Sequence, residues 1–213
     1  MMRNRLGPFA GSALLLSSLA LSGCGQGAVA SRKYFLLDTQ RQAPPASFHS
    51  DATLRVRPFH VDQAFAGRQL VYRVDTSQYE PDFYDQFLIP PGAMIAEKTR
   101  DWLAASDLFR RVSSSSGPLQ STYVLEGNVI EMYGDFTKAS APQAVMKIRF
   151  YFLASPDFNE TVVLVRTYEA SSPITARTAD AVVGALGNDL ADILTRLEAD
   201  LEKILRQKQE QQG

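Results

Sequence analysis

Residues 178–206, TADAVVGALGNDLADILTRLEADLEKILR, decide the fold of this chain. Their spacing predicts one long amphipathic helix, because steps of three and four residues gather apolar side chains on one face. Such a stripe usually packs on a sheet, although its last turn, with Ile204 and Leu205, is also suited to contact a partner. Residues 207–213 are polar, and we expect them to fray. The apolar positions are Val182, Val183, Leu186, Leu190, Ile193, Leu194, Leu197, Leu201, Ile204 and Leu205.

Strand patterns occupy much of the chain before this helix. Residues 145–153 alternate, and this places Met146, Ile148, Phe150 and Phe152 on one face. β-branched and aromatic residues between turn-forming residues predict the other strands. These strands are at 33–38, 53–58, 70–74, 109–112, 123–133 (with a bulge at Gly127) and 161–168.

A second helix and an ambiguous run lie in the middle of the chain. Pro90-Pro91-Gly92 precedes a helix predicted at 93–106, with Met94, Ile95, Trp102 and Leu103 as its apolar members. Residues 79–87 carry four aromatic side chains, whose spacing allows either a strand or a helical turn. The order of elements predicts an α/β fold: a single layered domain with a mixed β-sheet and a long C-terminal amphipathic helix. Several connections are too short for parallel crossovers, so the sheet is not all parallel.

The first 23 residues have the features of an export signal. Arg3 and Arg5 are followed by the apolar stretch 14–21, which is too short to span a bilayer. Leu21-Ser22-Gly23-Cys24 then matches the lipobox of bacterial lipoproteins, in which small residues enter a peptidase and the cysteine thiol accepts a diacylglyceryl group. The alternative is an ordinary secretory cleavage site that contains a cysteine. We expect cleavage before Cys24 and lipidation, with palmitate or similar acyl chains, of this one cysteine.

The residues after Cys24 predict which membrane the lipidated protein is sorted to. Residues 24–31 are small and polar and suit a tether, which leaves residues 32–206 as the domain and 207–213 as a polar tail. Gly25, Gln26 and Gly27 follow the cysteine, whereas an aspartate there retains enteric lipoproteins at the inner membrane. We therefore expect a lipid-anchored protein on the periplasmic face of the outer membrane.

Composition excludes several partners. Export removes Arg3 and Arg5 from the 22 basic residues and leaves 20 of them against 23 acidic ones. The mature chain is therefore slightly acidic, with no basic block, which argues against nucleic acid and against a polybasic membrane patch.

The sequence contains no recognisable catalytic motif. His49 and His60 are its two histidines, so a three-histidine zinc site is excluded, and His-Glu-x-x-His, Gly-x-Ser-x-Gly and Walker patterns are absent. A serine hydrolase built on either histidine stays open. Glu80, Asp82 and Asp85 lack calcium-loop spacing and are expected to be a solvated face. We predict no catalytic residue, no metal and no cofactor.

Several segments, taken in order, resemble the ABC-type transport auxiliary lipoprotein family, the family of PqiC-like intermembrane transport lipoproteins. No single motif is chemically diagnostic; the resemblance rests on the order of the segments and on the lipobox, and it covers nearly all of the mature chain. The segments are YFLL at 34–37, LRVRPFHV at 54–61, FAGRQLVYR at 65–73, YDQFLIPP at 84–91, Trp102-Leu103, LFRRV at 108–112 and YGDF at 133–136.

The resemblance implies a role in transport. Members of the family are accessory subunits of systems built from an ABC ATPase, a permease and an MCE protein, which move lipids or other hydrophobic molecules between the two membranes. It implies a non-catalytic lipoprotein with an α/β domain that docks an MCE-domain protein and assembles into a homo-oligomeric ring. Cys24 is the one residue whose chemical role carries over.

Two other classes of function stay open beside this one. They are a structural or assembly lipoprotein of the outer membrane and a periplasmic enzyme. Arg68, Tyr72 and Arg73 suit a partner-facing patch, together with Ile204 and Leu205. The alternative is that Tyr72 packs in the sheet while the two arginines cap its edge.

Overall fold

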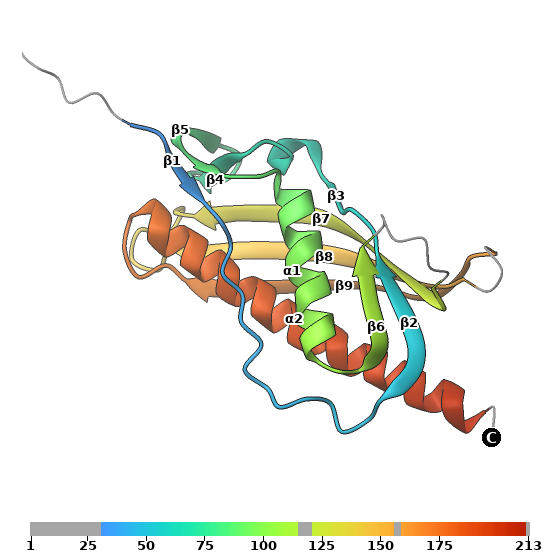
Figure 1. Cartoon of the computed structure of the whole chain (residues 1–213). Coiled ribbons are helices and arrows are strands. Elements are labelled where there is room, and N and C mark those ends of the chain that lie inside the picture. Colours follow the sequence, from blue (N-terminus) through green and yellow to red (C-terminus); the bar gives the residue numbers. More distant parts are fainter. Residues whose placement is uncertain (1–30, 115–120, 156–158, 212–213) are drawn as a thin grey trace, which may run out of the picture. The chain divides into compact units, whose positions relative to one another are not determined.

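A long C-terminal helix lies across one face of a mixed sheet (Figure 1). In the computed structural model, which describes residues 31–114, 121–155 and 159–211, this helix is α2, Ala179–Glu210. The side chain of Thr178 caps its first turn by accepting a hydrogen bond from the Ala181 amide. The chain divides into the units Met1–Ser31 and Arg32–Gly213, and the second unit contains every helix and strand described below.

The sheet is built around one long strand, β7. β8 pairs antiparallel along its whole length, and β9 pairs antiparallel with β8. The other edge of β7 is shared by β2, β3 and β4, which pair with it in parallel one after another. The described strands are β1 (Lys33–Phe35), β2 (Ser50–Val56), β3 (His60–Val61), β4 (Gln69–Arg73), β5 (Tyr79–Phe87), β6 (Phe109–Ser114), β7 (Tyr123–Asp135), β8 (Gln143–Ala154) and β9 (Thr161–Pro173).

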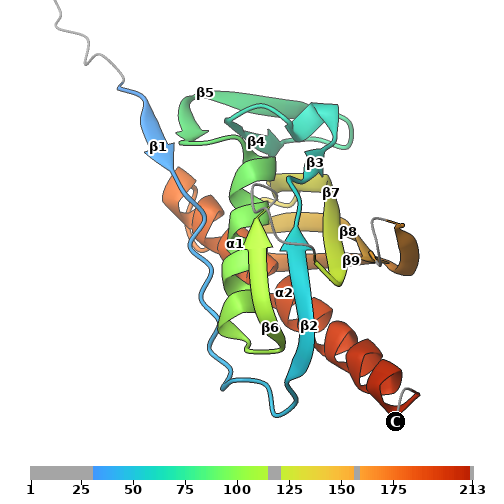
Figure 2. The same cartoon turned by 45° about the vertical axis from the view of Figure 1, so that its right-hand side comes forward.

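The outer strands complete two branches of the sheet. β6 lies parallel beside β2 at one end of β7. At the other end β5 pairs antiparallel with β4, and β1 pairs parallel with β5 (Figure 2). The predicted α/β fold with a mixed sheet and a long C-terminal helix is therefore confirmed.

The core lies between β7–β9 and α2. Met146, Ile148, Phe150 and Phe152 on β8 are fully buried, as their alternation predicted. The helix presents its predicted stripe to them, from Val182 to Leu205. Full burial of one such side chain contributes roughly 1.5–3 kcal/mol, so this layer contributes strongly to stability.

The second helix, α1, spans Pro91–Ala105 and packs on β6, β2 and β3. It begins two residues before the predicted start because Pro91 occupies its first turn, where the missing amide proton costs nothing. Met94, Ile95, Trp102 and Leu103 are buried, as expected for its apolar face. The helix ends at Ala105 with Ser106 as its C-cap, and Asp107 follows in the left-handed conformation with φ 59°.

The bulge predicted at Gly127 is wrong. Gly127 pairs with Phe150 in continuous register, and the irregularity in β7 lies between Val129 and Glu131. Gly127 serves packing, because a Cβ atom there would lie 2.6 Å from the ring of Phe59. That ring is buried edge-on against Phe150, with centroids 5.6 Å apart.

Several boundaries also differ from the prediction. The ambiguous run 79–87 is the strand β5, and β9 continues past residue 168 to Pro173. α2 continues to Glu210, where we expected fraying. β3 and a short 3₁₀ helix at Gln63–Phe65 were not predicted. β6 continues past the predicted residue 112 to Ser114.

Some predictions lie outside the described residues. These are the signal peptide, the lipobox with Cys24, and nearly all of the tether. Within the described part of the chain, no helix is long and apolar enough to cross a membrane.

Candidate functional site

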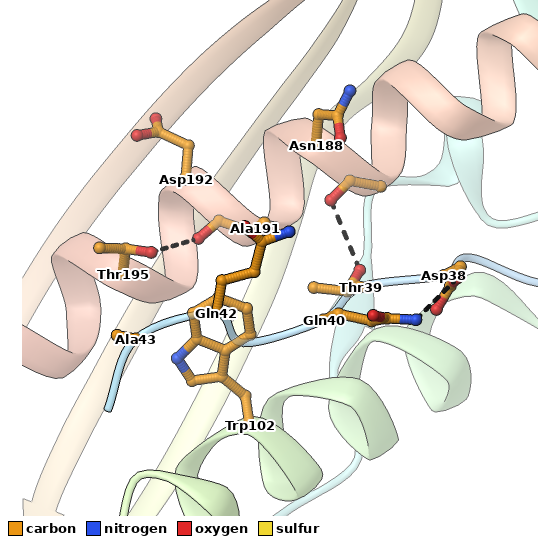
Figure 3. A pocket seen from close by; sticks show the side chains of 11 residues that line it. Asp38, Thr39, Gln40, Gln42, Ala43, Trp102, Asn188, Ala191, Asp192 and Thr195 are labelled. Atoms are coloured by element: carbon orange, nitrogen blue, oxygen red, sulfur yellow. Dashed lines mark hydrogen bonds between the residues drawn. The ribbon is translucent and has the colours of Figure 1, made fainter. Parts of the chain in front are cut away.

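A polar cleft lies between α2 and the segment that follows β1 (Figure 3). The segment 38–43 passes between α1 and α2, and the cavity beside it has a volume of about 490 Å³. Thr39 Oγ1 lies 3.5 Å from the Gly187 carbonyl oxygen, to which it donates. A Cβ atom on Gly187 would lie 2.4 Å from the Asp38 carbonyl oxygen, so a glycine is needed for this close approach. The lining residues are Asp38, Thr39, Gln40, Gln42, Ala43, Trp102, Gly187, Asn188, Ala191, Asp192 and Thr195.

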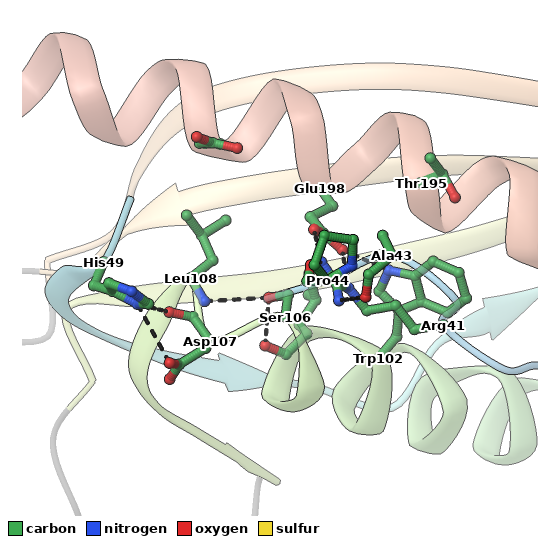
Figure 4. A network of polar contacts seen from close by, with 12 residues as sticks. Arg41, Ala43, Pro44, His49, Trp102, Ser106, Asp107, Leu108, Thr195 and Glu198 are labelled. Carbon is green, nitrogen blue, oxygen red and sulfur yellow. Dashed lines mark hydrogen bonds and ion pairs between the residues drawn. The ribbon is translucent and has the colours of Figure 1, made fainter. Parts of the chain in front are cut away.

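A buried ion pair fixes one wall of the cleft (Figure 4). Arg41 donates from Nε and Nη2 to the two carboxylate oxygens of Glu198, at 2.9 and 2.7 Å. The side chains of Arg41 and Glu198 are 6% and 13% exposed, respectively. Trp102 Nε1 donates to the same carboxylate at 2.8 Å. The hydrogen bonds of Arg41 to Glu198 raise the pKa of Arg41, against the effect of burial. We call Arg41, Glu198 and Trp102 the clasp, because they join the segment after β1 to both helices.

The chain beyond the clasp is fastened to the end of α1. Arg41 also donates to the carbonyl oxygens of Ala43 and Pro44, at 2.6 and 2.7 Å. The Ala46 amide donates to the Ser106 carbonyl at 2.8 Å. His49 Nδ1 lies 2.7 Å from the Asp107 carbonyl oxygen and 3.4 Å from its carboxylate, and the pair is exposed. His49 is therefore part of a surface contact of the helix end.

The chemistry available in the cleft is hydrogen bonding. Its lining includes amides, hydroxyl groups and the carboxylates of Asp38 and Asp192, but neither histidine. His60 is exposed on β3 and lies opposite Asn128 of β7 in the sheet. Within residues 31–114, 121–155 and 159–211, no group of three histidine, cysteine or carboxylate side chains is arranged to hold a metal ion.

A second cleft, of about 480 Å³, lies at the start of α2 and contains Tyr72. Tyr72 donates its hydroxyl proton to Asp82 Oδ2 at 3.1 Å, and burial together with that carboxylate raises the pKa of Tyr72. Asp85 also lines the cleft, and burial together with the charge of Asp82 raises its pKa. Asp82 accepts hydrogen bonds from the Tyr84 and Asp85 amides as well, at 2.8 and 3.0 Å. This carboxylate is therefore part of the local structure, rather than of the solvated face that we expected.

The structure does not gather Arg68, Tyr72 and Arg73 into one patch. Neighbouring residues of a strand point to opposite faces, so Arg73 faces away from the cleft of Tyr72. Arg73 forms an ion pair with Asp135 at 3.5 Å and lies over the ring of Tyr79. Arg68 is exposed and donates to the Leu88 carbonyl oxygen at 3.0 Å. Each of the three side chains therefore makes contacts within the domain, on different sides of β4.

The end of α2 is part of the domain. Leu205 is 3% exposed and belongs to the core, and Ile204 is partly buried against it. The apolar stripe is therefore covered by the domain as far as Leu205.

The clasp and the cleft were not predicted from the sequence. Arg41 and Glu198 are 157 residues apart; Arg41 lies between two predicted strands and Glu198 lies on the predicted C-terminal helix. A charged residue in either context is usually solvated, so no local signal distinguishes this pair.

Comparisons with known proteins define the fold. Neither the protein-family models nor the curated sequences match this chain. The crystal structure of XCC0632 from Xanthomonas campestris, a DUF330 protein, is 17% identical over 84% of this chain and 99% of that one, with a TM-score of 0.71. The crystal structure of an uncharacterised protein is 15% identical over 80% of this chain and 99% of that one, with a TM-score of 0.64. The hypothetical protein CT253 from Chlamydia trachomatis is 11% identical over 73% and 98%, with a TM-score of 0.50. The chain therefore shares its fold with the DUF330 protein XCC0632.

Proposed function

We propose that this chain is a lipid-anchored, non-catalytic subunit of an ABC/MCE-type system that transports lipids or other hydrophobic molecules between membranes. The observation that carries the proposal is the lipobox Leu21-Ser22-Gly23-Cys24, placed eight residues before a folded domain. Lipid on Cys24 holds the domain at the periplasmic face of the outer membrane, because Gly25 and Gln26 do not signal retention at the inner membrane. Within the system, the domain docks the periplasmic MCE-domain protein and assembles into a ring.

The chemistry of the described side chains supports a non-catalytic role. Glu198 and Asp82 are occupied by structural hydrogen bonds, and His49 is occupied by the end of α1. The sequence has no phosphate-binding loop, so ATP hydrolysis belongs to another chain.

The residues suggested by the sequence would contact partners at separate points rather than as one patch, because Tyr72 and Arg73 lie on opposite faces of β4. Arg68 is exposed, whereas Tyr72, Arg73 and Ile204 are partly exposed. Leu205 is buried, so it supports Ile204 from within and contacts a partner only if the helix end opens.

The test is isolation of the full chain, with a C-terminal affinity tag, from membranes of its own bacterium. We expect an MCE-domain protein in the eluate, in near-equal amount after mild cross-linking. Cys24→Ser is the matched control, because it removes the acylated thiol and leaves the domain unchanged. This variant should lose outer-membrane fractionation and most of the partner.

The alternative is a structural or assembly lipoprotein of the outer membrane without a transport role. It predicts a lipidated chain that elutes with envelope proteins and without an MCE-domain protein, a permease or an ABC ATPase. That result would reject the transport role and keep the anchor.

A further inference from the structure

Exposed apolar side chains gather on one face of β1 and β5. Tyr34 and Leu36 are 48% and 50% exposed. They alternate along the chain with Phe35 and Leu37, whose side chains face the core. β1 pairs parallel with β5, with Tyr34 opposite Gln86, so Tyr84 and Leu88 lie on the same face as Tyr34. They are 46% and 48% exposed.

Phe83 extends this surface and is 60% exposed. It lies where the pairing of β5 with β4 shifts register, and its ring meets that of Tyr84 edge-on, with centroids 5.3 Å apart. We call Tyr34, Leu36, Phe83, Tyr84 and Leu88 the β1–β5 patch. A contiguous apolar surface of this kind generally marks a site of interaction.

Two arginines accompany the β1–β5 patch. The guanidinium carbon of Arg32 lies 4.6 Å from the centre of the Phe83 ring, and that of Arg68 lies 5.9 Å from the Tyr34 ring. Such pairs keep the cation over an aromatic face, while its N–H groups donate in the plane of the guanidinium, as Arg68 does to the Leu88 carbonyl oxygen. The face therefore combines tyrosine, phenylalanine and leucine with positive charge.

The carboxylates of this region are directed to the other face of the strands. Asp85 lies opposite Lys33 in the register and lines the cleft at the start of α2. Asp82 is bound to the Tyr72 hydroxyl on the same side. Glu80 pairs across from Tyr72, so it also lies on that face. No carboxylate of β1 or β5 therefore lies on the patch side, so a negatively charged surface can approach the β1–β5 patch without repulsion from these strands.

The chain itself limits what can cover the β1–β5 patch. Arg32 follows Cys24 by eight residues, and eight residues span at most about 29 Å in any conformation. Lipid on Cys24 would therefore keep Arg32 within about 29 Å of the bilayer surface, where even a weak contact acts at high effective concentration.

We propose that the β1–β5 patch rests in the headgroup region of the phospholipid bilayer that holds the lipid on Cys24. The inference depends on the proposed lipid anchor and adds an orientation to it. Tyrosine and arginine are typical of membrane interfaces, where the ring enters the acyl boundary and the polar end stays in the headgroups. Arg32 binds lipid phosphates, and β9, at the opposite edge of the sheet, is directed away from the membrane.

The test uses the lipidated full chain in vesicles of phosphatidylcholine and phosphatidylglycerol. Tyr34→Trp places a fluorescent reporter in the β1–β5 patch, and Leu88→Trp places a second one beside it. Val165→Trp is the matched control, because Val165 is 50% exposed on β9. The wild-type chain supplies the background, since its one tryptophan, Trp102, is 6% exposed in the clasp.

Phospholipids brominated near the headgroup quench tryptophan that enters the interface. We expect the emission added by Tyr34→Trp and Leu88→Trp to fall about twofold or more, and that added by Val165→Trp to change little. Flotation of the vesicles, measured in parallel, reports the anchor separately. If the chain floats but neither patch reporter is quenched, the proposed orientation is wrong and the anchor stands.

The remaining outcomes are also decisive. A chain that neither floats nor shows quenching would reject the anchor and the orientation together. Patch reporters that are insensitive to bromine but shift their emission with protein concentration would show that a second copy covers the β1–β5 patch. Reporters that shift only on addition of the MCE-domain protein would assign it to that partner.

Discussion

At the scale of single residues, Asp189 is an unfavourably placed side chain of the core. It lies on the inner face of α2 with no exposed surface, and neither carboxylate oxygen has a hydrogen-bond partner among the described residues. Burial raises the pKa of Asp189 to about 7, although the nearby Ser172 side chain acts in the opposite direction, and the charge of Asp192 adds a smaller rise. The folded state therefore retains a proton that the unfolded chain releases near pH 4.

Asp189→Asn should stabilise the protein at pH 8. The folded wild type holds more protons than the unfolded chain between about pH 4 and pH 7, so its free energy of unfolding falls across that window. The free energy of unfolding falls by at most about 4 kcal/mol, and we expect the side-chain amide of the variant to restore about 2–4 kcal/mol of it at pH 8. Urea unfolding at pH 5 and pH 8 measures this, with the exposed Asp101→Asn as control. Equal pH slopes for wild type and Asp189→Asn would show that this carboxylate is not the source.

Glu198 should be important for stability, because it neutralises the buried charge of Arg41. Glu198→Ala leaves that charge unpaired and should cost about 3–5 kcal/mol. Glu202, one turn later, pairs with Arg206 near the surface. Glu202→Ala is the matched control and should cost at most about 1 kcal/mol. Thermal melting compares the two variants, and similar shifts would mean that the clasp does not fasten the segment after β1.

At the scale of elements, the sequence predicts those whose pattern is long and regular. α2 and β8 repeat their apolar positions over many residues, so tertiary contacts reinforce the local pattern. The run 79–87 fits both periods, and pairing with β4 and β1 decides that it is a strand. β3 has two residues and exists because β7 offers a free edge beside it, which no local pattern encodes.

The last turn of α2 should behave as core. Leu205→Ala removes a side chain that is 3% exposed and should cost about 2–5 kcal/mol. Gln209→Ala, one turn later at an exposed position, is the control and should leave the melting temperature nearly unchanged. A Leu205→Ala variant that melts like the wild type but loses the MCE-domain protein would instead assign this turn to the partner.

Gly127 should tolerate no side chain. Its missing Cβ atom makes room for the ring of Phe59, so Gly127→Ala overpacks the core and should cost about 1–3 kcal/mol. Combining it with Phe59→Leu should cost less than the sum of the two single changes, because the smaller side chain leaves room. A double-mutant cycle in urea measures the coupling, and strict additivity would contradict the packing role.

At the scale of the whole molecule, the sequence predicts the fold class but not the clefts. Both clefts lie between segments far apart in the chain, such as 38–43 with α2, and depend on how the sheet curls. The β1–β5 patch was equally hidden, since its members form separate aromatic runs until β1 pairs with β5. The anchor, in contrast, is a local motif, and the function and orientation proposed above depend on it.

The intact mass of the mature chain tests the lipid anchor, on which the proposed function and orientation depend, most directly. Protein purified from the membranes of its own bacterium should begin at Cys24 and carry a diacylglyceryl group together with an amide-linked acyl chain. Each buried methylene contributes about 0.8 kcal/mol, so these chains suffice for stable anchoring. Cys24→Ser should carry no acyl mass and should not be cut before residue 24. A wild-type chain that begins elsewhere, or that has a free thiol at Cys24, would contradict the account.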